Sequence, residues 1–166
     1  MTRELAIGIT IGVGVLILAG MAWGWRRRSR RDSALQAPVG ELGGDVVGSF
    51  SGLYVATTEH DEPLNRLAIR HLAFRSKVTA TVTTEGINLV MPGSPTIGLA
   101  KASLIGAGRA TWTIDRVVEK DGLVFISWQV NDTTVADSYL RLQESNPTSF
   151  LEALDRVLPN TTATGI

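Results

Sequence analysis

The chain has 166 residues, 44% of them hydrophobic, and a formal net charge of zero. It contains no cysteine, which excludes disulfides, thiolate zinc sites and cysteine nucleophiles and fits a reducing compartment. The charge is unevenly distributed along the chain. Residues 1–31 carry six basic residues and one acidic residue. Residues 32–166 carry ten basic and fifteen acidic residues, a net charge of −5. This acidic remainder predicts no nucleic-acid partner, since such binding needs Lys and Arg to neutralise phosphates.

An uncharged run from Leu5 to Trp25 opens the chain. As a helix, its 21 residues extend roughly 32 Å, which matches a hydrocarbon core about 30 Å thick. The apolar stretch of a cleaved signal peptide is shorter, about 7–15 residues, and Gly20-Met21-Ala22 is the only passable cleavage signal. We therefore expect residues 1–25 to form a short stub and a transmembrane helix over about residues 5–25, with a signal peptide as the alternative.

A cluster of arginines follows the apolar run at once. Its members are Arg26, Arg27, Arg28, Arg30 and Arg31. Because the more positive flank of a span stays in the cytoplasm, the cluster predicts a single-pass protein with its N-terminus outside and its C-terminal part cytoplasmic. Trp23 and Trp25 lie where indole rings favour the membrane interface. We expect the arginines to contact the anionic lipids of the inner leaflet.

Two GxxxG motifs lie within the apolar run, Gly8 with Gly12 and Gly20 with Gly24. This spacing lets two helix backbones approach closely, so it indicates a helix-dimer face and a homodimer formed through the span. The alternative is that glycine is simply common in membrane helices.

Residues 26–45 are expected to form a basic juxtamembrane segment and a linker. From Asp32 to about Asp45 the chain is poor in large apolar residues and contains Pro38 and three glycines, which predicts a flexible tether. The last residues, 160–166, are small and polar and predict a disordered tail. One folded domain is then expected over residues 46–159.

Most of this domain has the pattern of β-strands. Ser49 to Thr57 is rich in aromatic and β-branched residues. Alternating apolar residues over 78–82 and 87–91, with Glu85-Gly86 between them, predict a hairpin. Two further strands are expected around residues 97–105 and 110–118, with glycines marking bends.

The last strands and a helix complete the domain. Residues 123–130 and 134–142 flank the Asn131-Asp132 turn and predict a second hairpin. Asn146 is a favourable N-cap, Pro147 suits the first helical position, and apolar residues at helical spacing continue to Leu158. The fold class predicted is therefore an N-terminal transmembrane helix followed by a mainly-β domain. That domain is a bent sheet or barrel of about six or seven antiparallel strands with one C-terminal helix, like pleckstrin-homology (PH) domains.

Four segments also resemble a known family. They are Ala22-Trp23-Gly24-Trp25-Arg26-Arg27-Arg28, Gly52-Leu53-Tyr54-Val55, Thr84-Glu85-Gly86-Ile87 and Asp121-Gly122-Leu123-Val124-Phe125-Ile126-Ser127-Trp128. In them the chain resembles small actinobacterial "export or membrane" proteins with a single span and a PH-like cytoplasmic domain, often encoded near pyrimidine-biosynthesis genes. The resemblance implies a protein of the bacterial cell membrane, and it carries no catalytic signature.

The candidate chemical motifs predict no catalytic, cofactor-binding or metal site. His60, Asp61 and Glu62 are adjacent loop residues whose side chains would diverge, which favours a solvated loop over metal binding. His71 has no obvious catalytic partner and is expected at the surface or half-buried. Residues 106–111 lack the Lys-Ser/Thr of a phosphate-binding loop and predict a bend in a strand.

Four basic residues fall close together in the middle of the chain. They are Arg66, Arg70, Arg75 and Lys77. If residues 64–74 form a short helix or loop beside the barrel, the four could face lipid headgroups. The alternative is that they are scattered solvated charges.

Two functions of different class fit the sequence. The first is a membrane-tethered, non-catalytic binding or scaffolding module that offers a sheet edge, or the groove between sheet and helix, to a protein or peptide partner at the inner leaflet. The second is an accessory subunit of a transport or export complex, in which the span itself contacts the larger assembly. An enzyme is the third class, and no motif supports it.

Overall fold

The structure is a computed structural model that describes residues 3–32, 35–110, 112–113, 116–117, 122–142 and 147–158. The chain divides into two compact units, Met1–Ala34 and Leu35–Ile166, which are considered separately.

The first unit is the helix α1, Arg3–Asp32. Residues Ile7–Arg27 are long and apolar enough to cross a membrane. Its large apolar side chains are exposed, by 50% for Ile9 up to 76% for Trp25. The expected helix is confirmed, and it continues through the arginines. Nothing lies within 4 Å of a Cβ built on Gly8, Gly12, Gly20 or Gly24, so this glycine face is open and the homodimer stays a prediction.

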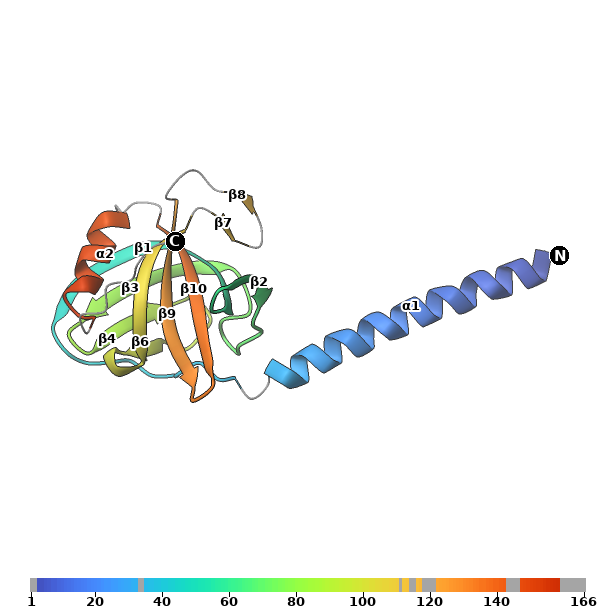
Figure 1. The fold of residues 1–166 in the computed structure, drawn as a ribbon, viewed down its shortest axis with the longest axis horizontal. Coiled ribbons are helices and arrows are strands. Elements are labelled where there is room, and N and C mark those ends of the chain that lie inside the picture. Colours follow the sequence, from blue (N-terminus) through green and yellow to red (C-terminus); the bar gives the residue numbers. More distant parts are fainter. Residues whose placement is uncertain are drawn as a thin grey trace. The chain divides into compact units, whose positions relative to one another are not determined.

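The second unit is built on one antiparallel sheet (Figure 1). Its strands are β1 (Val46–Glu59), β2 (Glu62–Arg66), β3 (Ser76–Thr83), β4 (Gly86–Val90), β5 (Ile97–Ala100), β6 (Leu104–Ala110), β9 (Leu123–Asn131) and β10 (Thr134–Leu142). The order is β5-β4-β3-β1-β10-β9-β6, and β2 pairs with the end of β1. This arrangement confirms the predicted PH-like architecture.

The helix α2, Pro147–Asp155, packs against the sheet and buries Phe150, Ala153 and Leu154. The ring of Phe150 meets that of Phe50 edge to face, with centroids 5.2 Å apart and planes at 84°. The helix begins at Pro147 as predicted, whereas the predicted N-cap, Asn146, lies outside the described residues.

Two predicted hairpins are confirmed by their registers, in which Thr83 pairs with Gly86 and Thr134 with Asn131. The expected strand over 97–105 is corrected, because a 3₁₀ turn, Lys101–Ser103, divides it into β5 and β6. The expected strand over 110–118 is also corrected. In its described residues, β7 (Trp112–Thr113) and β8 (Arg116–Val117) pair with each other in a separate two-stranded sheet.

The entry segment, residues 35–45, is ordered against the edge of the sheet. Val39 forms an antiparallel bridge with Ile97, and this bridge is flanked by backbone hydrogen bonds from Gly40 N to Thr96 O (2.9 Å) and from Gly98 N to Pro38 O (3.0 Å). A Cβ on Gly98 would lie 2.6 Å from the carbonyl oxygen of Gly40, so only glycine permits this approach. The entry segment therefore adds a short strand to β5, which corrects the prediction of a flexible tether over these residues.

Candidate functional site

A buried chain of hydrogen bonds crosses the inner face of β9, β10 and β1. Trp128 Nε1 donates to Ser138 Oγ at 3.0 Å, Ser138 Oγ lies 2.7 Å from Thr57 Oγ1, and Thr57 Oγ1 lies 2.6 Å from the Tyr54 hydroxyl. Tyr54 in turn donates to the carbonyl oxygen of Leu72 at 2.9 Å. The chain thus joins three strands to the connection between β2 and β3.

The groups at the two ends of this buried chain fix the direction of every hydrogen bond in it. Leu72 O can only accept, so the single hydroxyl proton of Tyr54 is committed to it. Tyr54 must then accept from Thr57, and Thr57 must accept from Ser138, while Trp128 Nε1 can only donate. Every hydroxyl in the chain is satisfied, which is the condition under which a buried polar network rigidifies a core.

Both tyrosines of the protein resist ionisation. Burial raises the pKa of Tyr54 above its ordinary value of 10.0, and the hydrogen bond with Thr57 only partly offsets this. Burial also raises the pKa of Tyr139 above the same ordinary value. The chain of hydrogen bonds through Tyr54 is therefore neutral at physiological pH.

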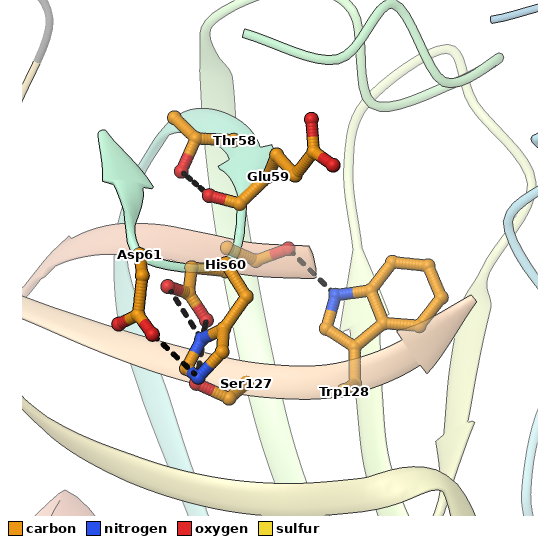
Figure 2. Close-up of polar contacts among 8 residues, drawn as sticks. Thr58, Glu59, His60, Asp61, Ser127 and Trp128 are labelled. Carbon is orange, nitrogen blue, oxygen red and sulfur yellow. Dashed lines mark hydrogen bonds and ion pairs between the residues drawn. The ribbon is translucent and has the colours of Figure 1, made fainter. Parts of the chain in front are cut away.

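A second polar cluster lies on the opposite face of β9 and β10 (Figure 2). Ser127 Oγ donates to Asp137 Oδ1 at 2.5 Å, and His60 Nδ1 lies 2.9 Å from the same oxygen and 3.1 Å from Oδ2. His60 Nε2 also lies 3.7 Å from Asp61 Oδ2. The buried carboxylate of Asp137 thus holds the turn after β1 against the sheet.

This cluster does not have the order of a nucleophilic triad. In a triad the histidine lies between the serine and the carboxylate, whereas here Asp137 binds both Ser127 and His60. Ser127 is only 2% exposed and its hydroxyl proton is directed at the carboxylate. Among the described residues no group of three His, Cys, Asp or Glu could hold a metal ion. The half-exposed His60 is thus hydrogen-bonded to Asp137, a partner that the local sequence did not indicate.

The β2–β3 connection, residues 67–75, is pinned to the sheet. Leu67, Ile69 and Leu72 are buried in the main core. Tyr54 holds the carbonyl of Leu72, and Arg66 Nη2 donates to the carbonyl of Ala73 at 2.9 Å. The next residue in the chain, Phe74, is nevertheless 83% exposed.

The four predicted headgroup ligands have different surroundings in the structure. Arg70, Arg75 and Lys77 are exposed, whereas Arg66 is half-buried and supports Ala73. The expectation of a short helix or loop over 64–74 is corrected in part, because β2 extends to Arg66. His71 is half-buried, which was one of the two positions expected for it. Its φ is 69°.

The two ends of the sheet differ. The entry segment covers the free edge of β5, whereas β6, at the other end, pairs only with β9 among the described residues. Small residues, Gly106, Ala107 and Gly108, form the middle of β6. The strand has a register shift between Leu104 and Gly106 and pairs regularly with β9 from Gly106 to Ala110, so the irregularity lies just before the residues where a bend was predicted. Arg109 at the end of β6 donates to Thr148 of α2, so strand and helix lie side by side.

A family model described as bacterial PH domain-like matches residues 33–154. The chain belongs to the bacterial PH domain-like family. The match includes the entry segment, which agrees with its place on the sheet of this PH-like domain. A comparison with curated proteins gives no match. The PH-like part of the resemblance is thus confirmed, while the actinobacterial family and the gene neighbourhood stay predictions.

The residues predicted to lie at the membrane interface are on α1. The guanidinium carbon of Arg27 is 6.0 Å from the ring centroid of Trp23, one helical turn away, which is within range of a cation–π contact. Trp25 and Arg26 are exposed. The side chains of Arg28, Arg30 and Arg31 lie outside the described residues.

Proposed function

We propose that this protein is a membrane-tethered, non-catalytic binding module whose PH-like domain takes up a polypeptide segment at the inner leaflet. The observation that carries the proposal is the edge of β6. It is unpaired among the described residues and lies beside α2.

An exposed strand edge presents a row of backbone donors and acceptors, to which an extended peptide adds as a further strand. The exposed Thr148 of α2, which accepts a hydrogen bond from Arg109, lies beside β6 and would contact the side chains of the bound segment.

The tether is the helix α1. Its apolar span supports insertion in a bilayer, and its arginines favour a cytoplasmic position for the PH-like domain. Membrane attachment confines a binding module to two dimensions, which raises its effective concentration toward partners in the same membrane. A module with a modest intrinsic affinity therefore suffices.

The test is photocrosslinking in native membranes from two matched positions. A photoreactive residue replaces Arg109 on β6 in one variant and Arg141 on β10 in the other. Both arginines are exposed, but β10 is paired on both sides by β1 and β9. We expect a discrete polypeptide adduct from position 109 and none from position 141. Equal adducts at both positions, or none at either, would contradict the proposal.

A further inference from the structure

The entry segment, residues 35–45, is bound to the sheet mainly through its backbone. Val39 pairs with Ile97 at the edge of β5, as an added strand does when a peptide binds a sheet. Beyond this pair the side-chain amide of Asn88 on β4 binds both the N–H and the carbonyl of Leu42. The sheet thus recognises an extended main chain at two successive points.

Two glycines of the sheet make room for the side chain of Leu42. A Cβ on Gly86 would lie 2.9 Å from Leu42 Cδ1, and a Cβ on Gly98 would lie 2.9 Å from Leu42 Cγ. Gly98 pairs with Asn88 across β5 and β4, and Gly86 lies two residues before Asn88, so the three residues share one face of the sheet. This face therefore accepts a leucine at the position whose backbone Asn88 holds.

Most of the entry segment is nevertheless exposed. Only Ala37 is buried among residues 35–45, and the residues on either side of Leu42 are open to solvent. A segment that buries so little apolar surface opens at a lower free energy than the core of its domain. Because the segment precedes β1, the eight strands of the sheet can keep their pairings when it leaves.

We infer that this surface is a second polypeptide-binding site, which the entry segment occupies as a ligand supplied by its own chain. The β4–β5 site consists of Gly86, Asn88, Ile97 and Gly98. Its partner is an extended segment of another polypeptide with the pattern of residues 39–42, a β-branched residue, glycine, any residue and leucine. Such a partner would displace residues 35–45 and so lengthen the connection between α1 and β1. The inference goes beyond the proposed function, because it uses neither β6 nor the membrane.

A synthetic fluorescent peptide with the sequence of residues 35–45 tests the β4–β5 site on the full-length chain in detergent. The attached segment competes with the peptide, so the wild type is compared with Leu42→Gly, which weakens the attached ligand and leaves the site intact. Fluorescence anisotropy should show about tenfold tighter binding to Leu42→Gly, since a half-buried leucine no longer holds the attached segment. A control peptide that carries Leu42→Gly itself should bind the same chain about tenfold more weakly.

An engineered disulfide gives a second measurement. Hydrogen bonds from Gly40 N to Thr96 O and from Gly98 N to Pro38 O flank the Val39–Ile97 pair, which is therefore a non-hydrogen-bonded antiparallel pair. The Cα atoms of such a pair are about 4.5 Å apart, within the range of a disulfide. Val39→Cys with Ile97→Cys is added to the Leu42→Gly chain, which has no other cysteine. Oxidation should abolish peptide binding, and reduction of the same protein should restore it.

The matched control is the pair Ser49→Cys with Thr81→Cys in the same chain. The hydroxyls of these residues lie 3.4 Å apart, so a disulfide there joins β1 to β3 and leaves the entry segment free. Oxidation of the control should leave peptide binding unchanged. Failure of the peptide to bind Leu42→Gly, or binding that survives oxidation of the pair at 39 and 97, would overturn the inference. Neither result bears on the proposed function, which depends on the adduct from position 109.

Discussion

The side-chain amide of Asn88 makes both hydrogen bonds that a neighbouring strand would offer to the backbone of Leu42. Leu42 N donates to Asn88 Oδ1 at 2.8 Å, and Asn88 Nδ2 donates to Leu42 O at 2.9 Å. Asn88 is buried on β4, forty-six positions along the chain, so this pair fixes the entry segment where the strand-like pairing of Val39 ends.

Replacing Asn88 should therefore release the entry segment. Asn88→Ala removes both bonds and should destabilise the domain by about 2 kcal/mol, because two backbone groups lose their partners. Asn88→Asp keeps the acceptor for Leu42 N but sets a carboxylate oxygen against the carbonyl oxygen of Leu42, so it should not restore the stability that Asn88→Ala loses. Amide hydrogen exchange should accelerate at residues 38–42, and the control Gln129→Ala, at an exposed side chain, should change nothing. Equal exchange in all variants would show that the amide does not hold this segment.

Removing the hydroxyl of Tyr54 breaks the buried chain of hydrogen bonds next to its end at Leu72 O. In Tyr54→Phe the carbonyl of Leu72 loses its donor and Thr57 loses its acceptor, so the free energy of unfolding should fall by about 2 kcal/mol. Chemical denaturation of the detergent-solubilised chain measures this loss. Hydrogen exchange in the β2–β3 connection should accelerate as well. If the variant is as stable as the wild type and the β2–β3 connection is still protected from exchange, the assigned hydrogen bonds of Tyr54 are wrong.

Stability should fall in alkaline solution because of the same residue. The pKa of Tyr54 is raised in the folded state, so the unfolded chain releases its phenolic proton first as the pH passes 10.0. Between the ordinary and the raised pKa the folded state binds more protons, and the free energy of unfolding decreases with rising pH. Unfolding measured at about pH 9 and about pH 11 should show this decrease, and Tyr54→Phe should show less of it. If the two proteins show an equal pH dependence, Tyr54 is not the residue that causes the loss of stability.

The predicted orientation can be tested with an introduced thiol. Glu152→Cys places one on the exposed face of α2 in a chain that has no other cysteine. A membrane-impermeant maleimide should fail to label intact cells and should label them after permeabilisation. Labelling of intact cells would place the PH-like domain outside.

Local patterns predicted the elements that depend on neighbours in sequence. Strict alternation in β3 and β4, the Asn131-Asp132 turn and the helical spacing after Pro147 were sufficient for the two hairpins and α2. The strand β2 was not predicted because it is short, contains Pro63 and has no clear alternation of apolar and polar residues. It exists because the end of β1 pairs with it, as in the register of Thr58 with Arg66.

The entry segment and the polar clusters depend on contacts that local patterns do not encode. Glycine and proline suggested a flexible tether, yet the entry segment is held by the backbone of β5 and by one distant asparagine. Ser138 and Thr57, the central pair of the buried chain, are 81 positions apart. The basic residues around Phe74 were identified from the sequence, but the exposure of that ring was not, because an isolated phenylalanine is expected in a core.

We expect the edge of β6 to bind its partner independently of any contact made by the span. Residues 5–25 are replaced by an unrelated apolar span of equal length, the arginines are retained, and crosslinking from position 109 is repeated in native membranes. We expect the same polypeptide adduct at a similar yield. Loss of that adduct, with the chimaera still inserted in the membrane, would contradict it and would favour an accessory subunit that assembles through its span.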